Sequence, residues 1–352
     1  MINRRTFLAP LAALPLAAAL PAQAHADAPT APAPGAGRGR PDRLRVVAEK
    51  REGRVLDVTV SSPAIGQEAV IRLLLPNGWS KQSHRRWPVL WMMHGATGDH
   101  TMWTDHTDLA AVTADRDVLV VVPDGGPCSY YSNWWNYGAY GPPAWQTFHL
   151  DEVRTLLERD YGAGPRRAIA GLSMGGLGAM KYAAARPGMF RAAASYSGVL
   201  NPSSPRVVVG GRYGDADFAA SVAVFIKNYG LDPVAMWGDR EEQAAVWAAN
   251  NPTDLVWWLR GMPLYVSGGD GNPGPLDPPP SSRLRSSREV PPCTQFDPNE
   301  AMFGPMSNDF VAAGRKVGLR LTASLGAGTH TMPYWQHHLH ESFPMLMDAL
   351  GA

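Results

Sequence analysis

Ala168-Ile169-Ala170-Gly171-Leu172-Ser173-Met174-Gly175-Gly176 is the stretch that decides the fold class of this chain. A short apolar run that suits a buried strand ends in glycines around a serine, and a helix-forming stretch follows at once. Glycines flank the serine because a sharp strand-to-helix turn leaves no room for side chains. This context is that of a nucleophile elbow, so we predict that Ser173 is a catalytic nucleophile raised above the edge of a sheet.

The segments around this turn alternate between strand-like and helix-like patterns. Residues 45–49, 54–61 and 68–75 resemble antiparallel strands, and buried strands are predicted at 88–93, 117–122, 167–170, 192–195, 264–266 and 319–324. Helices are predicted near 105–113, 147–160, 175–186, 300–316 and 337–350. Apolar strands that alternate with helices indicate a mostly parallel sheet covered on both faces. We therefore predict one α/β-hydrolase domain over residues 44–352.

Two stretches interrupt this alternation. Residues 202–261 are helical in pattern and contain Trp237, Trp247, Trp257 and Trp258. An insertion of this kind forms a wall or lid over the site, or packs over the edge of the sheet. Residues 268–298 are rich in proline, glycine and serine, so we predict a long surface loop there.

The first 24 residues have the pattern of an export signal. Arg4 and Arg5 precede an apolar segment that is too short and too rich in proline to span a bilayer, and Ala22-Gln23-Ala24 suits cleavage. Paired arginines favour the twin-arginine route, with an ordinary secretory signal as the alternative. Residues 25–43 have little to bury and are predicted to form a disordered spacer. We predict a secreted protein without a permanent membrane span.

Charge and cysteine content limit the partners and the compartment. The chain has 32 basic and 31 acidic residues, so no basic surface calls for nucleic acid. Cys128 and Cys293 are the two cysteines, and in an oxidising compartment an even pair favours a disulfide. We predict that bridge at the border of the site. Nothing in the pattern calls for a metal or another cofactor.

A serine nucleophile needs a base, and in this fold the histidine comes last in the chain. His330 has that place, because it follows the last predicted strand and precedes the last predicted helix. His337, His338 and His340 lie within that helix at spacings that scatter them around it, without an acidic partner pattern. His94 ends a buried strand, and we expect it to shape the loop that binds the oxyanion.

The acid of the triad is left open by the pattern. Asp270 follows the predicted strand 264–266, where many hydrolases of this fold place their acid. Glu300 opens the next helix, and Asp297 and Asp309 are further candidates. Composition and spacing do not decide among the four.

Three motifs in order resemble one known family. They are 129–134 (Ser-Tyr-Tyr-Ser-Asn-Trp), the elbow 171–176, and 328–335 (Gly-Thr-His-Thr-Met-Pro-Tyr-Trp). Together they resemble the esterase D-like group that includes the secreted mycolyltransferases (antigen 85), over about residues 47–350. The resemblance implies Glu300 as the acid of the triad, since that family has a glutamate near the start of the helix before the last strand. It also implies an oxyanion hole formed by the backbone N–H groups of Ala96 and Met174.

Two departures from that family concern the acceptor. Thr97 and Met332 stand where the mycolyltransferases have an arginine and a tryptophan around trehalose. The resemblance therefore favours a broader acyl esterase over a trehalose-specific mycolyltransferase. We predict that aromatic side chains form a wall for an acyl chain or a sugar, and the residues are Trp103, Tyr130, Tyr131, Trp134 and Trp135. For each of them, ordinary packing is the alternative.

Three functions follow as hypotheses from these patterns. The first is a secreted serine esterase with a Ser173-His330-Glu300 triad and an acyl-enzyme intermediate, acting on an acyl ester of a lipid or a sugar. The second is an acyltransferase that moves the acyl chain to a sugar or glycerol hydroxyl. The third is a surface-binding relative that keeps the fold without the activity, because a fold alone does not fix function.

Overall fold

The computed structural model describes residues 43–204, 207–208, 215–216, 218–278 and 296–352. The predicted export signal and all but the last residue of the predicted spacer lie outside the described residues. Across the described part of the chain, no helix is long and apolar enough to cross a membrane.

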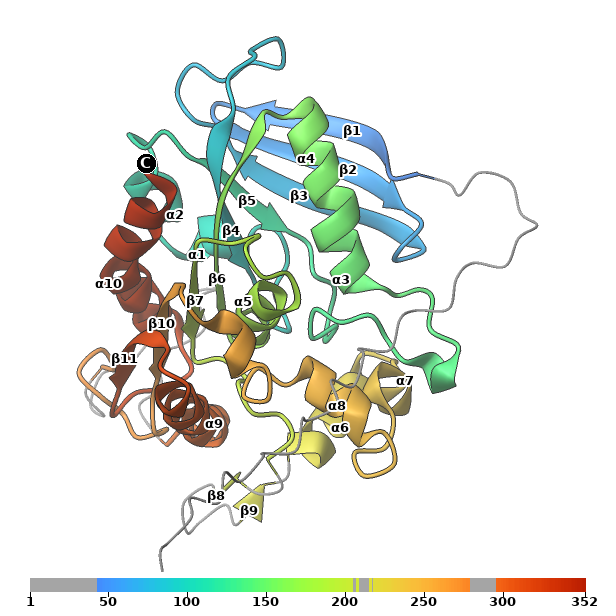
Figure 1. The fold of residues 1–352 in the computed structure, drawn as a ribbon, viewed down its shortest axis with the longest axis vertical. Coiled ribbons are helices and arrows are strands. Elements are labelled where there is room, and N and C mark those ends of the chain that lie inside the picture. The colour runs from blue at the N-terminus through green and yellow to red at the C-terminus, as the bar shows by residue number, and fades with distance from the viewer. Residues whose placement is uncertain (1–42, 205–206, 209–214, 217, 279–295) are drawn as a thin grey trace, which may run out of the picture. The chain divides into compact units, whose positions relative to one another are not determined.

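A nine-stranded sheet forms the centre of the fold, in the order β1-β2-β3-β5-β4-β6-β7-β10-β11 (Figure 1). The strands are β1 (Arg45–Glu52), β2 (Val55–Ser62), β3 (Gln67–Leu74), β4 (Trp87–Met93), β5 (Leu119–Pro123), β6 (Ala163–Leu172), β7 (Ala192–Tyr196), β10 (Pro263–Gly268) and β11 (Arg320–Leu325). The β1-β2-β3-β5 part is antiparallel, and every pair from β5 to β11 is parallel. The predicted mostly parallel sheet is confirmed.

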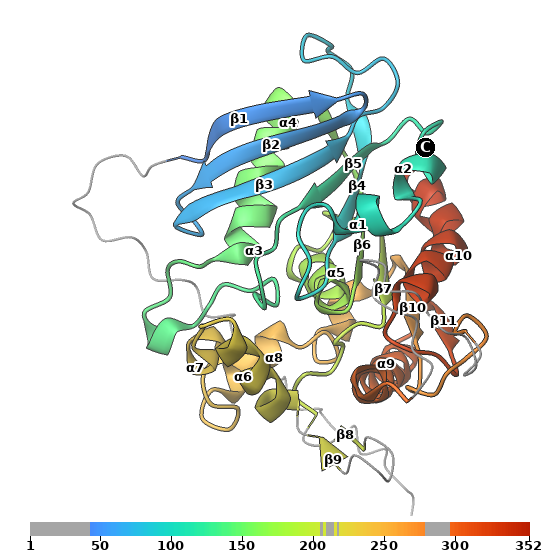
Figure 2. The ribbon, with the colours of Figure 1, turned by 180° about the vertical axis from the view of Figure 1, so that it is seen from behind.

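Helices cover both faces of this sheet, as Figures 1 and 2 show. Successive side chains of a strand point to opposite faces. In β4, Trp91 and Met93 accordingly pack into one core cluster, and Leu90 and Met92 pack into the other. The first cluster includes side chains of α4 (Arg154–Asp160), α5 (Met174–Ala185) and α9 (Pro298–Lys316), and the second includes those of α10 (Met332–Leu350). Burial on both faces explains why the central strands are unbroken apolar runs.

The helix predicted at 105–113 is wrong, because two short helices occupy this region. They are α1 (Met102–His106) and α2 (Leu109–Val112), with extended backbone at Thr107 between them. The Thr107 hydroxyl donates to the Trp103 carbonyl and accepts from the Leu109 N–H at 3.2 Å. A threonine that bonds to its neighbouring backbone competes with the helix and ends it here.

The helix predicted at 147–160 is present as three consecutive helical pieces. They are α3 (Trp145–Thr147), η2 (Phe148–Val153) and α4, and η2 has π-helical hydrogen bonding. The helix therefore begins at Trp145, slightly earlier than the pattern indicates.

The insertion predicted at 202–261 is helical where the structure describes it. It contains α6 (Phe218–Asn228), α7 (Pro233–Trp237), α8 (Ala244–Asn250) and η3 (Val256–Leu259), together with the short pair β8 (Val207–Val208) and β9 (Asp215–Ala216). Trp237 and Trp247 are buried with ring centroids 5.0 Å apart, whereas Trp257 and Trp258 are exposed. Of the loop predicted at 268–298, the described residues 269–278 and 296–297 contain neither helix nor strand.

Candidate active site

Ser173 lies at the junction of β6 and α5. β6 ends at Leu172 and α5 begins at Met174, so the serine occupies the turn alone. Its φ of 55° and ψ of −121° are outside the regions that side chains ordinarily allow. Backbone strain of this kind persists only where the surrounding structure enforces it.

The glycines of the elbow are required by close backbone packing. A Cβ atom on Gly171 would lie 2.3 Å from the Gly175 carbonyl oxygen. A Cβ atom on Gly175 would lie 2.3 Å from the Met93 carbonyl oxygen at the end of β4. Because backbone atoms cannot move aside, both positions exclude any other residue and fix the path of the turn.

Glu300 and His330 form a buried acid–imidazole pair. Glu300 lies in the first turn of α9 and is fully buried, and its Oε2 is 2.6 Å from His330 Nδ1. Its Oε1 accepts the Gly269 N–H, so both carboxylate oxygens have partners. Because Nδ1 faces Glu300, Nε2 is the nitrogen left for a proton from Ser173.

The other candidate acids do not contact the His330 ring. Asp270 is exposed and accepts the Asn272 N–H at 2.8 Å. Asp309 is also exposed and accepts a hydrogen bond from the Asn201 amide. Asp297 is buried and accepts the backbone N–H of His330 at 2.7 Å. Among the four candidates, Glu300 alone pairs with the imidazole.

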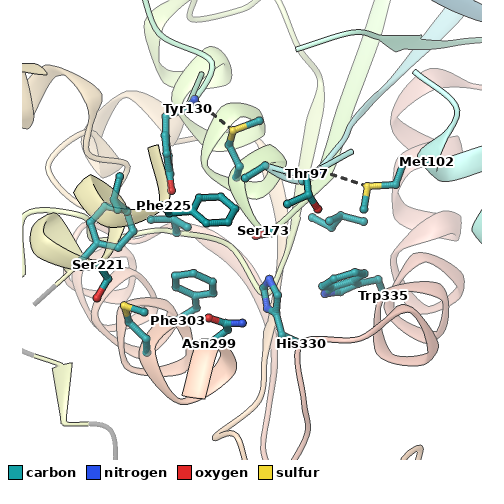
Figure 3. Close-up of a pocket in the computed structure, with 18 residues that line it drawn as sticks. Thr97, Met102, Tyr130, Ser173, Ser221, Phe225, Asn299, Phe303, His330 and Trp335 are labelled. Carbon is teal, nitrogen blue, oxygen red and sulfur yellow. Dashed lines mark hydrogen bonds between the residues drawn. The ribbon is translucent and has the colours of Figure 1, made fainter. Parts of the chain in front are cut away.

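Ser173 and His330 line the same pocket, and they face each other in Figure 3. Two aromatic rings border the imidazole: the Phe303 centroid is 5.0 Å away, and the Trp335 centroid is 4.9 Å away at an interplanar angle of 87°. No hydrogen bond joins Ser173 to His330 in the described chain. Catalytic hydrogen bonds are often long before substrate binds and tighten in the complex.

The two predicted oxyanion donors, Ala96 and Met174, both line the pocket beside Ser173. Met174 is the first residue of α5, and the first N–H groups of a helix have no acceptor within it. Ala96 lies in the loop after β4, and its carbonyl accepts the Cys128 N–H at 3.2 Å. Two backbone N–H groups near a serine hydroxyl can hold the negative charge of a tetrahedral intermediate.

His94 fixes the loop that contains Ala96. It is fully buried, and its Nε2 accepts the Gly125 N–H at 2.7 Å. Its Nδ1 lies 2.7 Å from the Gly95 carbonyl oxygen, and donation to this carbonyl agrees with an Nε2 that accepts. The Tyr131 hydroxyl donates to the His94 carbonyl at 3.0 Å. These bonds place His94 in the structural role that the sequence indicates.

The pocket has a volume of about 300 Å³ and largely apolar walls. Helix α6 contributes Phe218, Val222 and Phe225 to this lining, and Figure 3 shows Phe225 on the side of the pocket away from Trp335. Asn299, Met302 and Phe303 come from α9. These residues were not among those that the sequence motifs predicted. The i, i+4, i+7 spacing of the three α6 residues was the available signal of an apolar helix face.

Of the five aromatic residues predicted to form a wall, Tyr130 lines the pocket, and Trp135 is half-buried and absent from the pocket lining. Trp103, Tyr131 and Trp134 are buried outside the pocket lining, which matches the ordinary packing given as their alternative role. Trp103 Nε1 donates to the Met93 carbonyl at 3.0 Å, and Trp134 Nε1 donates to the Ser129 carbonyl at 3.3 Å. Their polar atoms bond to backbone, which indicates that these rings support the loops.

The two positions that depart from the mycolyltransferase pattern differ in their relation to the site. Thr97 lines the pocket, so a neutral side chain stands beside the oxyanion loop. Met332 begins α10 and packs against the second core cluster instead. The tryptophan that lines the pocket from this helix is Trp335.

The predicted disulfide cannot be compared with the structure, because Cys293 lies outside the described residues. Cys128 is buried, and burial raises the pKa of its thiol to about 11. The bridge stays a prediction.

The histidines of α10 have acidic partners, contrary to the sequence expectation. His340 Nε2 is 2.9 Å from Asp108. Glu341 lies 3.5 Å from His337 Nε2 and 3.0 Å from His338 Nδ1. The sequence expectation is wrong because it considered only the spacing of the histidines, and not the acidic residues Asp108 and Glu341. Among the described residues, His337, His338 and Glu341 have ligand atoms within 4.8 Å of one another, a spacing that could hold a metal ion.

Comparison with known proteins identifies esterases and acyltransferases as relatives. The Esterase family model matches residues 62–269. Esterase Rv1288 of Mycobacterium tuberculosis is 36% identical over 236 residues, which are 64% of this chain and 48% of that protein. The chain thus spans about half the length of that relative. Diacylglycerol acyltransferase/mycolyltransferase Ag85A of Mycobacterium leprae is 28% identical over 309 residues, covering 83% of this chain and 82% of the relative.

Solved structures confirm the predicted fold. MPT51 of Mycobacterium tuberculosis superposes with a TM-score of 0.64 at 22% identity, covering 85% of this chain and all of that one (100%). An S-formylglutathione hydrolase from Agrobacterium tumefaciens gives a TM-score of 0.60 at 16% identity, covering 87% of this chain and 99% of that one. At these identities the likeness concerns the fold alone.

Proposed function

The chain belongs to the Esterase family, and on that premise we propose that it is an exported serine esterase that works through an acyl-enzyme on Ser173. The observation that carries the proposal is the pair formed by Glu300 and His330 beside the strained serine. A fully buried carboxylate whose Oε2 is 2.6 Å from an imidazole nitrogen orients that ring and stabilises its protonated form.

The proposed reaction starts with attack of Ser173 Oγ on the ester carbonyl carbon. The Ser173 proton passes to His330 Nε2, while Glu300 stabilises the resulting imidazolium. The carbonyl oxygen becomes an oxyanion held by the Ala96 and Met174 N–H groups, each contributing on the order of 3 kcal/mol to the transition state. The tetrahedral intermediate then collapses: the ester C–O bond breaks, and the leaving alkoxide takes the proton from His330.

The second half of the cycle repeats these steps with water. His330 removes a proton from water, whose oxygen attacks the acyl carbon, and a second oxyanion forms at the same two N–H groups. Collapse of this intermediate breaks the bond to Ser173 Oγ, which regains its proton from His330. The carboxylic acid leaves and the free enzyme is restored.

The pocket supports an acyl ester as the substrate. Phe218, Val222 and Phe225 of α6 form an apolar wall that suits a hydrocarbon chain but offers a charged acyl group no partner. A volume of about 300 Å³ suits a chain of short to medium length. We propose that the acyl chain lies against α6 and that the alcohol part leaves past Thr97.

The export signal and the domain limits are also proposals. The arginine pair and the Ala22-Gln23-Ala24 site support export of a mature chain whose catalytic domain covers residues 44–352. The detection of a mature N-terminus after Ala24 in culture medium would support the export signal, and retention of the full-length chain in the cytoplasm would contradict it.

An acyltransferase is the second candidate, because the similarity to an acyltransferase/mycolyltransferase covers 83% of this chain. In that case a sugar or glycerol hydroxyl replaces water in the second half of the cycle. The test is to add trehalose or glycerol during turnover and to quantify free acid and new ester. New ester formed in proportion to the acceptor identifies a transferase, and free acid alone identifies a hydrolase.

Hydrolysis of p-nitrophenyl esters of increasing chain length tests the main proposal. We expect wild-type protein to release p-nitrophenol and Ser173→Ala to lose about 10⁶-fold in kcat, as in other serine hydrolases. Equal rates for the two proteins would refute Ser173 as the nucleophile.

A further inference from the structure

Asp297 contacts both members of the acid–imidazole pair through their backbones. Its Oδ2 accepts the His330 N–H at 2.7 Å. Its Oδ1 accepts the N–H groups of Asn299 at 2.9 Å and of Glu300 at 3.4 Å. We propose that Asp297 is a positioning residue that holds the base and the acid in one rigid unit. The inference rests on the proposed function, because it assigns Asp297 a part in that reaction.

Local sequence explains why a carboxylate occupies this place. Asp297 is the N-cap of α9, and Pro298 follows it at the first helical position, where its fixed φ suits a helix start. Aspartate is favoured at an N-cap because its oxygen satisfies N–H groups that lack partners in the helix. One oxygen meets this need, which leaves the second oxygen for His330.

The hydrogen bond from the His330 N–H to Asp297 Oδ2 lies in a buried place. Asp297 is 8% exposed, and hydrogen bonds to an ionised acceptor are stronger than those between neutral groups. His330 is consequently held at two points, its N–H by Asp297 and its Nδ1 by Glu300. Asp297 and Glu300 both lie at the start of α9. The two hydrogen bonds therefore fix the position of the His330 imidazole relative to Glu300.

The loop around His330 has a separate anchor. The Thr329 hydroxyl donates to Asp277 Oδ1 at 2.7 Å, and the Tyr334 hydroxyl donates to Asp277 Oδ2 at 2.8 Å. Loss of the Asp297 bond should therefore leave a folded protein in which the ring is less well placed. A displacement of about 1 Å at a reacting group can reduce the rate on the order of a hundredfold.

Asp297→Ser separates the two roles of this carboxylate. Serine is a good N-cap but has one oxygen and a shorter side chain, so it can cap α9 without reaching His330. We expect kcat for p-nitrophenyl butyrate to fall at least about tenfold, with KM unchanged and Tm close to that of wild type. A purely structural residue would instead lower Tm and leave the kcat of the folded fraction intact.

Asp232→Ser is the matched control. Asp232 also precedes a proline and caps a helix, since its Oδ1 accepts the Val234 N–H at 2.9 Å at the start of α7. No residue of α7 lines the described pocket. We expect this variant to keep wild-type kcat and KM.

Asp297→Asn keeps the side-chain volume and provides a second test if the serine variant is unstable. Its single oxygen can serve the helix or His330 but not both, so we expect a smaller loss of kcat than in Asp297→Ser. If Ser173→Ala is inactive while Asp297→Ser and Asp297→Asn both keep the wild-type kcat, Asp297 is not a positioning residue. Activity that survives in Ser173→Ala overturns the proposed function itself.

Discussion

The two sides of the pocket are held in place by different kinds of contact. On the reacting side, Ser173 is fixed by backbone packing and His330 by hydrogen bonds to two carboxylates. On the opposite side, α6 presents Phe218, Val222 and Phe225, which meet the pocket with apolar side chains. Hydrogen bonds have defined directions and fix geometry, whereas apolar contacts tolerate changes of shape.

We expect the reacting side of the pocket to set kcat and the α6 side to set the selectivity for the acyl chain. A change on the reacting side should lower kcat, because the transition state depends on atomic positions there. A change on the α6 side should alter which acyl chain fits and leave the chemistry intact. The comparison fails if substitutions on the two sides have the same kinetic effect.

Among the variants that test this comparison between the two sides, Glu300→Gln should have the largest effect. The amide cannot stabilise the imidazolium and can support the wrong tautomer of His330, so kcat should fall on the order of 10³- to 10⁴-fold. Steady-state hydrolysis of p-nitrophenyl butyrate measures this loss. Asp270→Asn is the control, and its activity should equal that of wild type because Asp270 is exposed. The reverse ranking of the two variants would show that the acid is Asp270.

The next effect concerns His149, whose ring centroid is 5.5 Å from that of Tyr131, the residue that bonds to the His94 carbonyl. His149 is fully buried between the Asp124 carbonyl and the Tyr182 hydroxyl, each 2.9 Å from a ring nitrogen. Burial lowers its pKa to about 4, below the ordinary value of 6.5. The unfolded chain therefore binds a proton first as pH falls, and stability is lost between about pH 6.5 and pH 4.

Chemical denaturation at two pH values measures that loss. Between pH 7 and pH 5, His149 should account for about 2 kcal/mol of the fall in the free energy of unfolding. His149→Gln can retain both hydrogen bonds without titrating, so its stability should depend less on pH. Parallel pH profiles for the two proteins would contradict this role of His149.

Phe225→Ala tests the α6 side. Removal of the ring enlarges the pocket, so the ratio of kcat/KM for octanoate to that for butyrate should rise on the order of tenfold. Tyr229→Ala is the matched control, since Tyr229 packs against Phe225 with centroids 5.4 Å apart and is absent from the pocket lining. An unchanged ratio in Phe225→Ala, with a lower kcat for every ester, would break the distinction between the two sides.

The smallest effect is expected from Tyr131→Phe. This change removes the hydroxyl bond to the His94 carbonyl and should cost about 1 kcal/mol of stability. Because Tyr131 is buried outside the pocket lining, KM should not change. If Tyr131→Phe raises KM without a loss of stability, Tyr131 contacts the substrate, contrary to this account.

The sequence predicted the parts of the molecule that follow local rules. The elbow is readable because glycines, an apolar strand and a helix must be adjacent in the chain. The choice among four acids was not readable, since it depends on how the start of α9 faces His330 across 30 residues of chain. Resemblance to a family supplied Glu300 where the pattern could not.

The structure differs from the sequence predictions where a side chain's contacts are not encoded in the local pattern. The segments around the site contain three aromatic residues that are buried, Trp103, Tyr131 and Trp134. The sequence has no signal that distinguishes an aromatic side chain of a pocket wall from one of the core. Thr107 broke a helix through hydrogen bonds of its own hydroxyl, which a periodic pattern does not register.

The most direct test of the central claim is to locate the covalent adduct of a fluorophosphonate by peptide mass mapping. Wild-type protein should carry one adduct on Ser173, Ser173→Ala should carry none, and Glu300→Gln should react more slowly because His330 is a weaker base. An adduct on another residue, or equal labelling of Ser173→Ala, would contradict the assignment of the nucleophile and the mechanism built on it.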